Sequence, residues 1–182
     1  SVPDYSGHGR SDGVFTPMKC IKTFVKLFDA FKEGCIGTNS YDAISKKLKY
    51  KRVIGIGRSL GGTYVPLLPR FNPRIQELGI FCPVVDSKSC GSVIGEETND
   101  DFLRGMSDDG YHHLYRGILS PVWKKHWENE DDLSPMDNID YLANAKLFIA
   151  HGKKDMCVNY YNSTTYYKHI QKKFQGEKSH LA

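Results

Sequence analysis

The sequence predicts an α/β fold, in which a mostly parallel sheet is covered by helices on both faces and a small lid is inserted between core elements. Two observations carry this prediction. Short apolar segments at 52–57, 78–85 and 145–150 have the composition of buried strands, and parallel strands that are covered on both faces are apolar throughout. Segments of helical character separate them, and strands that alternate with helices form parallel sheets.

Each of the three strand segments is bounded by residues that end a strand. Residues 52–57 are β-branched and apolar, with charged residues before them and glycine after them. Pro83 lies within the segment 78–85, and because proline cannot donate to a ladder, this strand is expected to be interrupted or to lie near an edge. The segment 145–150 is followed directly by His151 and Gly152. We expect right-handed crossovers between these strands.

The clearest helix is predicted over residues 17–32. Thr16 is an N-cap residue, and Pro17 suits the first helical position, where no N–H donor is needed. Apolar residues then recur at helical spacing, at Ile21, Phe24, Val25, Phe28 and Phe31. Gly34 and Gly37 are expected to end this helix.

Three further helices and one insertion complete the predicted order of elements. A weaker helix is expected over 41–48, and others over 60–69 and 159–174. Between residues 87 and 132, glycine, acidic and aromatic residues mix without periodicity, which favours a lid or cap as much as a long helical connection. At 182 residues, the chain is expected to form a single domain over 1–182.

Composition excludes several classes of protein. The formal net charge of +4 comes from scattered lysines, whereas a nucleic-acid-binding face would concentrate them. No apolar run approaches the ~20 residues that a membrane-spanning helix requires. The five cysteines are widely spaced and include no C-x-x-C pair, so neither a zinc site nor a disulfide framework is predicted. Reduced thiols favour a cytoplasmic protein, although the chain starts without methionine, and processing or truncation could have removed a leader.

The most informative segment is GRSLGG at 57–62, a G-x-S-x-G sequence between a predicted strand and a predicted helix. A serine at such a turn is held in a strained conformation with its hydroxyl projecting from the carboxyl edge of the sheet. Side chains two positions on either side would collide, so glycine is expected at Gly57 and Gly61, and Gly62 extends the pattern. The sequence therefore predicts that Ser59 is a nucleophile; the alternative is a glycine-rich turn without catalysis.

A serine hydroxyl needs a base and an orienting carboxylate, which follow it in the order acid and then histidine when the serine lies at this kind of turn. Asp155 lies just beyond the strand segment that ends at Ala150, at the same edge of the sheet as Ser59. Its alternative role is to cap the next helix. His180 follows Asp155 and is the candidate base. The Leu60 amide, at the start of the helix, is the natural oxyanion donor.

The other histidines fit catalysis less well. His112, His113 and His126 precede Asp155 in the chain. His169 lies within a predicted helix beside lysines, which favours a surface position. His8 and His151 precede glycines in turns, where we expect structural hydrogen bonds. Aromatic residues in the insertion are expected either to line an acyl pocket or to pack a lid core: Tyr111, Tyr115, Trp123 and Trp127.

These motifs together resemble the α/β-hydrolase superfamily, in particular its prolyl-oligopeptidase-like and dienelactone-hydrolase-like branches. DYSGHGRSDG at 4–13 resembles the family's D-x-x-G-H-G-x-S stretch, 57–62 its nucleophile elbow, 134–142 the segment that enters a late strand, and 151–155 its H-G-x-x-D element. The order matches over nearly the whole chain. The resemblance implies hydrolysis of an acyl ester, thioester or peptide substrate through an acyl-enzyme, without a metal or organic cofactor.

Carried over by position, the resemblance gives Ser59 as nucleophile, Asp155 as orienter, His180 as base and the Leu60 N–H as oxyanion donor. Two departures accompany it. The chain lacks the family's early strands, one of which is followed by the loop that supplies the second oxyanion donor. The segment between Phe174 and His180 is also too short for the strand that the family places there. The alternative interpretation is a non-catalytic hydrolase scaffold, or a fragment of one, that acts as a binding module.

Overall fold

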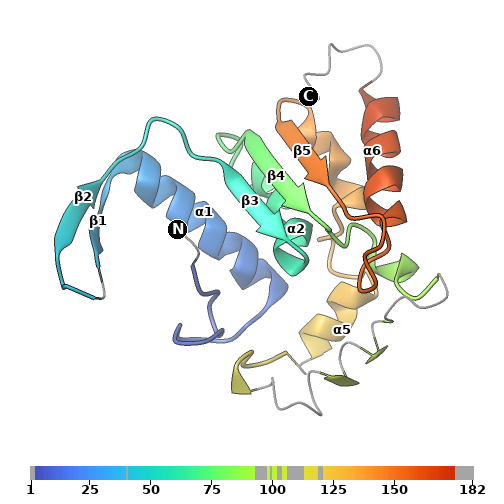
Figure 1. Cartoon of the computed structure of the whole chain (residues 1–182), viewed down its shortest axis with the longest axis horizontal. Coiled ribbons are helices and arrows are strands. Elements are labelled where there is room, and N and C mark those ends of the chain that lie inside the picture. Colours follow the sequence, from blue (N-terminus) through green and yellow to red (C-terminus); the bar gives the residue numbers. More distant parts are fainter. Residues whose placement is uncertain are drawn as a thin grey trace.

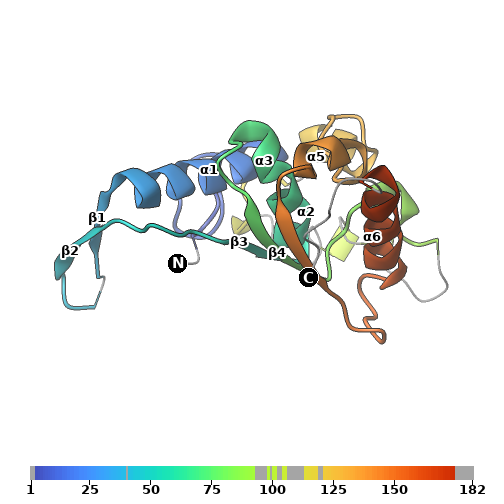
Figure 2. The same ribbon diagram turned by 90° about the horizontal axis from the view of Figure 1, so that it is seen from above.

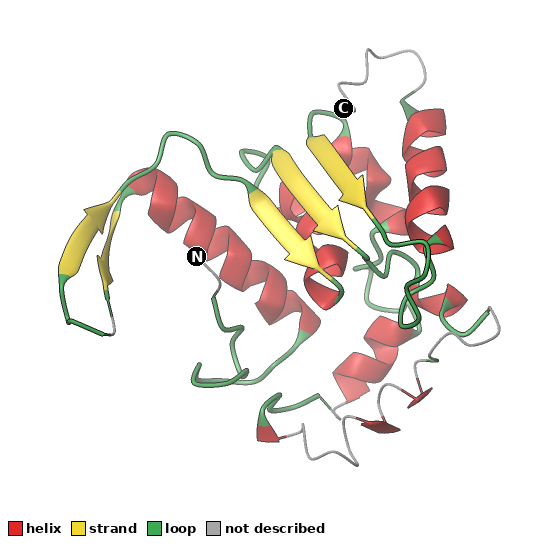
Figure 3. Cartoon of the chain, in the orientation of Figure 1, coloured by secondary structure: helices red, strands yellow, loops and turns green. Residues whose placement is uncertain are grey.

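The computed structural model of this chain describes residues 3–39, 41–92, 98, 100–101, 104–105, 113–118 and 121–174. Its centre is a parallel sheet of three strands flanked by helices (Figures 1 and 3). The strands are β3 (Gly55–Arg58), β4 (Glu77–Phe81) and β5 (Lys146–Ala150), in the order β3-β4-β5. All three run in the same direction, so their carboxyl ends meet at one edge of the sheet. The α/β class and the three predicted strands are thus confirmed.

The two faces of the sheet differ in cover. One face buries Leu78, Ile80 and Leu147 beneath helices, and Figure 2 shows α1 (Pro17–Glu33) and α3 (Leu68–Phe71) on this side. On the other face, Ile56 of β3 pairs with Gly79 of β4, and Gly79 pairs with Phe148 of β5. Ile56 and Phe148 are 61 % and 54 % exposed on this face. Among the described residues, helices therefore cover one face of the sheet, and β3 carries exposed apolar surface that its buried-strand composition did not predict.

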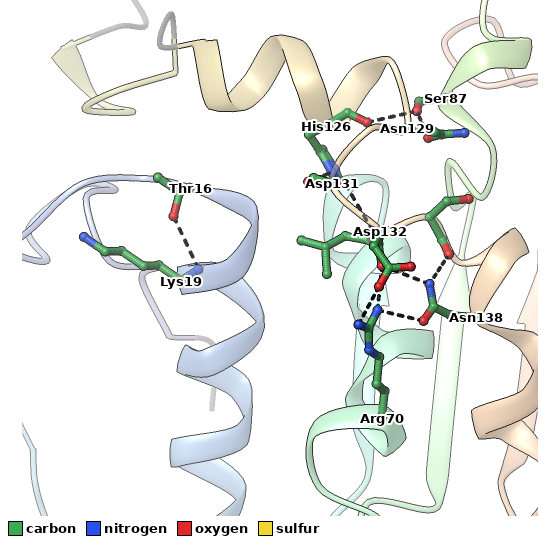
Figure 4. Close-up of polar contacts among 11 residues, drawn as sticks. Thr16, Lys19, Arg70, Ser87, His126, Asn129, Asp131, Asp132 and Asn138 are labelled. Atoms are coloured by element: carbon green, nitrogen blue, oxygen red, sulfur yellow. Dashed lines mark hydrogen bonds and ion pairs between the residues drawn. The ribbon is translucent and has the colours of Figure 1, made fainter.

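Helix α1 begins and ends where the sequence predicts. Thr16 caps it, with the Lys19 amide donating to Oγ1 at 3.4 Å (Figure 4). Its buried stripe includes Cys20, Ile21 and Phe28. The helix ends at Gly34, whose φ of 113° favours glycine.

The predicted helix over 60–69 is present as three short consecutive pieces. They are α2 (Leu60–Tyr64), the 3-10 helix η1 (Val65–Leu67) and α3. Pro66 and Pro69 are the second residues of η1 and α3, and the helix is broken there because proline lacks the N–H that a continuous helix would use. Residues 61–69 are all buried.

The predicted helix over 41–48 is wrong. The structure has an antiparallel hairpin instead, with β1 (Cys35–Thr38) paired to β2 (Ser45–Leu48), set apart from the main sheet in Figure 3. The turn is closed by backbone hydrogen bonds between Asn39 and Ile44 and between Ala43 and Asn39. The hydroxyls of Thr38 and Ser45 also meet across the hairpin at 2.8 Å. These cross-strand contacts outweigh the weak helical preference of the lysine-rich segment.

Further elements along the chain are η2 (Ser87–Ser89), α5 (Pro121–Trp127), η4 (Met136–Leu142) and α6 (Tyr161–Lys173). Arg70 of α3 ties the segment between α5 and η4 to the core, because its guanidinium donates to the Asp132 carbonyl and carboxylate, each at 2.6 Å, and to the Asn138 side chain at 2.9 Å (Figure 4). The assignment of 1–182 to one domain with an insertion at 87–132 stays a prediction, since part of that segment lies outside the described residues.

Within the described part of the chain, no helix combines the length and apolar character needed to cross a membrane. All five cysteines are described and none forms a disulfide.

Candidate functional site

Ser59 occupies the turn between β3 and α2. Its φ of 51° and ψ of −123° lie in a region that residues with a side chain rarely adopt, and the residue is exposed. The Ser59 amide donates to the Phe81 carbonyl at 3.0 Å, and the Ser59 carbonyl accepts from the Thr63 amide at 3.1 Å. The Ser59 side chain makes no capping hydrogen bond to the helix. The backbone is thus fixed on both sides of an exposed hydroxyl.

The glycines around Ser59 are there because backbone segments approach each other closely. A β-carbon added to Gly57 would lie 2.1 Å from the Gly61 carbonyl oxygen, which is closer than any real contact. At Gly62 the added carbon would lie 3.1 Å from the Pro83 Cα, and at Gly61 it would lie 3.3 Å from the Tyr5 hydroxyl. The expected crowding across the turn is therefore present, and it is most severe at Gly57.

The Leu60 amide is the first of the helix that follows the serine. Leu60 begins α2, and the opening amides of a helix lack partners within it. Because these N–H groups carry partial positive charge, an oxyanion beside Ser59 would be stabilised there. The assignment of the Leu60 amide as oxyanion donor stays a prediction.

Asp155 lies in the loop that follows β5. Its Oδ1 accepts hydrogen bonds from the Cys157 amide at 2.9 Å and from the Val158 amide at 3.0 Å. Partial burial raises the pKa of the Asp155 carboxyl, but the hydrogen bonds from the Val158 and Cys157 amides outweigh this effect and hold the pKa below its ordinary value. The group is therefore an ionised carboxylate at neutral pH, as an orienting acid must be.

His151 shapes the loop that carries Asp155. Its side chain is 4 % exposed, with Nδ1 2.7 Å from the Ser163 hydroxyl and Nε2 2.8 Å from the Val158 carbonyl. Because a carbonyl can only accept, Nε2 carries a proton and donates it to the Val158 carbonyl. Nε2 also lies 3.6 Å from the Asp155 carboxylate. The structural hydrogen bonds predicted for His151 are confirmed.

The structure brings two of the three predicted catalytic residues to the same edge of the sheet. Ser59 follows β3 and Asp155 follows β5, with β4 between them (Figure 1). Cys82, directly after β4, lies between these two turns, and the sequence interpretation did not single it out. Its position follows only from the strand order β3-β4-β5, in which the residue after the middle strand lies between the outer two.

The third predicted catalytic residue, His180, lies outside the described residues, as do His112 and Tyr111. Of the other histidines, His126 is buried with Nδ1 2.9 Å from Asp131, and His169 is exposed on α6 as predicted. His180 stays the predicted base, because it follows Asp155 in the chain.

The aromatic residues of the predicted lid serve as packing where they are described. Trp123 is fully buried, its ring is stacked on Phe15 with centroids 4.9 Å apart, and its Nε1 donates to the Phe15 carbonyl at 2.8 Å. Trp127 is also buried in the core, and Tyr115 stacks on His8 with centroids 4.5 Å apart. Of the two predicted roles, core packing is the one that these contacts support.

The glycine-rich loop of residues 4–13 is held by Arg116, which lies within the predicted insertion at 87–132. The guanidinium donates to the carbonyls of Gly9, Ser11 and Gly13, and the Arg116 amide donates to the Gly7 carbonyl. The loop therefore has a defined shape beside the elbow, where the Tyr5 hydroxyl approaches Gly61. Among the residues that the structure describes, no group of three or more His, Cys, Asp or Glu side chains is arranged to hold a metal ion.

Solved structures that are similar to this chain include two hydrolase-related proteins. One is a puromycin hydrolase, 16 % identical in sequence, for which the match covers 63 % of this chain and 15 % of that chain, with a TM-score of 0.40. The other is a lipase-esterase related protein from Clostridium acetobutylicum, 18 % identical, with coverage of 92 % and 69 % and a TM-score of 0.49. No family model and no curated protein matches the chain. These likenesses are too distant to decide function, which rests on the site itself.

Asp155→Asn is expected to lower the free energy of unfolding at neutral pH, because a neutral amide oxygen accepts more weakly than a carboxylate from the two backbone amides. Folding lowers the pKa of Asp155. The ionised carboxylate therefore contributes to the free energy of unfolding above the ordinary Asp pKa of about 3.9, and this contribution is lost as the pH falls through the lower pKa of the folded state. Urea unfolding at several pH values measures this difference between the wild type and the variant.

The matched control is Asp12→Asn, at an exposed aspartate, for which we expect little difference at any pH. If the difference between wild type and Asp155→Asn persists undiminished at a pH of about 2, where carboxylates are protonated, the stabilising charge is not at Asp155.

Proposed function

We propose that this chain is a serine hydrolase of the α/β-hydrolase type, which cleaves a carboxylic ester, thioester or peptide through an acyl-enzyme on Ser59. The observation that supports the proposal best is the backbone of Ser59, an exposed serine at φ 51° in a turn that has no room for a side chain at Gly57. Such strain costs about 1–3 kcal/mol and tends to be kept where function requires it.

The proposed mechanism begins with attack of the Ser59 Oγ on the substrate carbonyl carbon. A base takes the hydroxyl proton as the new C–O bond forms, and His180 is assigned this role because it follows Asp155 in the chain. The negative charge that develops on the carbonyl oxygen lies by the Leu60 amide. The tetrahedral intermediate then collapses, the base returns its proton to the leaving group, and water cleaves the acyl-enzyme by the reverse path.

Asp155 holds the base in this mechanism. An ionised carboxylate fixes the tautomer of the catalytic imidazole and stabilises the imidazolium that forms on proton transfer. Oδ1 accepts from the Cys157 and Val158 amides, whereas Oδ2 lies 3.6 Å from His151 Nε2, beyond hydrogen-bonding distance. We therefore propose that Oδ2 receives the hydrogen bond from the base.

Labelling with a fluorophosphonate tests the proposal. The serine oxygen forms a bond to phosphorus as fluoride leaves, so only an activated serine is labelled, and peptide mass spectrometry locates the adduct. We expect the adduct on Ser59, its loss in Ser59→Ala, and unchanged labelling in the control Ser45→Ala, at an exposed serine of the distant hairpin. A folded chain that is never labelled would instead be a non-catalytic scaffold that serves as a binding module.

A further inference from the structure

The hairpin β1–β2 and the connection that follows it carry the net charge of the chain. Residues 35–52 contain five Lys or Arg residues and one Asp, which gives a net charge of +4. The whole chain has 25 Lys or Arg and 21 Asp or Glu residues, so the rest of it holds 20 of each and is balanced. The positive charge is therefore concentrated on one element, and is not scattered as the composition suggested.

Four of these basic residues are lysines on the surface. Arg52 is paired, because its Nε lies 2.5 Å from the Glu77 carboxylate. The exposed lysines are Lys46, Lys47, Lys49 and Lys51. In the part of the chain that the structure describes, the lysines in ion pairs are Lys124 and Lys173. The hairpin thus presents positive charge that no described acidic side chain pairs with.

The same hairpin exposes large apolar side chains. Tyr41 in the turn is 98 % exposed, Ile44 is 53 % exposed, and Ile36 of β1 is 76 % exposed. Figures 1 and 2 show the hairpin beyond the end of α1 and away from the three-stranded sheet. Its base is fixed, since the Tyr50 amide donates to the Phe31 carbonyl at 2.8 Å and the two rings meet edge to face. Exposed apolar groups on such a projecting element mark an interaction site.

We propose that the hairpin β1–β2 docks this chain on the surface of an anionic lipid bilayer, with Tyr41 and Ile44 among the headgroups and the lysines beside the lipid phosphates. Clusters of four or more lysines are attracted to anionic bilayers, and neighbouring apolar side chains add burial at the interface. Lys46 and Lys47 lie two and three residues from Ile44, or about 7–10 Å along a strand. Their amines therefore reach the phosphates when the turn enters the headgroup region.

The apolar side chains favour a bilayer over a nucleic acid as the partner. A nucleic acid is bound by lysines at its phosphates and by aromatic rings that stack on bases. The Tyr50 ring is packed against Phe31, which leaves Tyr41, and an isoleucine offers no ring for a base to stack on. At a bilayer interface both tyrosine and isoleucine bury apolar surface.

Sedimentation of the full chain with vesicles tests the role of the charge. We expect binding to phosphatidylcholine vesicles that contain about one-third phosphatidylserine, and much weaker binding to phosphatidylcholine alone. The triple variant Lys46→Gln/Lys47→Gln/Lys49→Gln should bind the anionic vesicles about a hundredfold more weakly, from about a fivefold loss per lysine. Added salt should weaken the binding of the wild type, because it screens exposed charges.

The matched control removes the same charge from α5 and α6, in the triple variant Lys125→Gln/Lys168→Gln/Lys172→Gln at three exposed lysines. This variant should bind the anionic vesicles as the wild type does. Equal weakening in the two triple variants would show that the bilayer attracts the net charge of the chain and not the hairpin, and would overturn the proposal.

Tyr41→Trp tests whether the turn enters the bilayer. The two tryptophans of the chain, Trp123 and Trp127, are buried, so the introduced indole adds an exposed emitter. Its emission should shift to shorter wavelength on anionic vesicles and be quenched by brominated lipid. Tyr141→Trp, at a half-exposed tyrosine of η4, is the control and should show neither change. An unshifted spectrum in Tyr41→Trp would overturn the insertion of the turn.

A duplex oligonucleotide and the fluorophosphonate complete the design. If the wild type stays in solution with anionic vesicles but binds the oligonucleotide through the same lysines, the partner is a nucleic acid and the bilayer proposal is wrong. Labelling of Ser59 should be equal in the wild type and in the hairpin triple variant, because the hairpin is distant from Ser59. Loss of vesicle binding therefore leaves the hydrolase proposal intact, and a chain that is never labelled leaves the docking proposal intact.

Discussion

Ser59→Ala is expected to slow cleavage of an activated ester, such as a p-nitrophenyl ester, by about a thousandfold or more, and Ser59→Gly is expected to do the same. Both variants remove the oxygen that would attack the carbonyl carbon. They differ only in the β-carbon, and the backbone at position 59 has a φ of 51° and a ψ of −123°, which glycine adopts readily. Ser59→Gly is therefore expected to be more stable towards urea than Ser59→Ala, by about 1 kcal/mol.

Two measurements on the same pair of proteins thus separate chemistry from strain. The rate of ester cleavage shows whether the Ser59 hydroxyl is needed for the reaction. The midpoint of urea unfolding shows whether the backbone at position 59 is strained when the residue has a β-carbon. The control Ser45→Ala removes an exposed hydroxyl from the hairpin and should cleave the ester at the wild-type rate. Wild-type activity in Ser59→Ala would place the nucleophile elsewhere, and equal stability of the alanine and glycine variants would mean that the turn holds no strain.

The elements that could be predicted from the sequence are those whose apolar residues recur at a regular spacing or whose ends are marked by capping or turn residues. Helix α1 was predicted because its apolar residues repeat every three or four positions and because Thr16 and Gly34 mark its ends. Strand β5 was predicted from a short apolar segment that ends at a glycine-containing turn. In both, local preference and the final packing agree, so the pattern is visible without the rest of the chain.

The hairpin β1–β2 was mispredicted because its stability comes from pairing. Residues 45–48, Ser-Lys-Lys-Leu, have no clear period, and lysine is compatible with a helix surface as well as with an exposed strand. What decides the structure is the partner strand Cys35–Thr38, together with the turn that sets the register. Interactions between two short segments cannot be read from either of them alone.

At the candidate site, the sequence predicted individual residues and not their neighbours. Ser59 and Asp155 were proposed from the sequence because each follows a strand segment in a recognisable motif, and the structure places both at the carboxyl edge of the sheet. The position of Cys82 between them depends on the order β3-β4-β5, which no local pattern encodes. The exposed face at Ile56 was missed for a similar reason, since an apolar strand has the same composition whether one face or both are covered.

Gly57→Ala is expected to destabilise the protein by about 3 kcal/mol or more and to abolish labelling of Ser59. The added β-carbon would lie 2.1 Å from the carbonyl oxygen of Gly61, 2.4 Å from its carbonyl carbon and 2.8 Å from the Gly62 amide nitrogen. These are backbone atoms of the first turn of α2, which cannot rotate away as a side chain would. To admit one methyl group, the turn has to open, and opening it moves the Ser59 hydroxyl and the Leu60 amide apart.

Gly79→Ala is the matched control, because it adds the same methyl group in the neighbouring strand β4, where the nearest atom is the Ile56 Cγ1 at 3.7 Å. That is an ordinary contact, and alanine loses less chain entropy than glycine on folding, so we expect a change within about 1 kcal/mol and normal labelling. Urea unfolding and fluorophosphonate labelling of both variants make the comparison. If Gly57→Ala is as stable and as readily labelled as Gly79→Ala, the close approach across the turn is absent in solution, and the conformation that presents Ser59 for attack is absent with it.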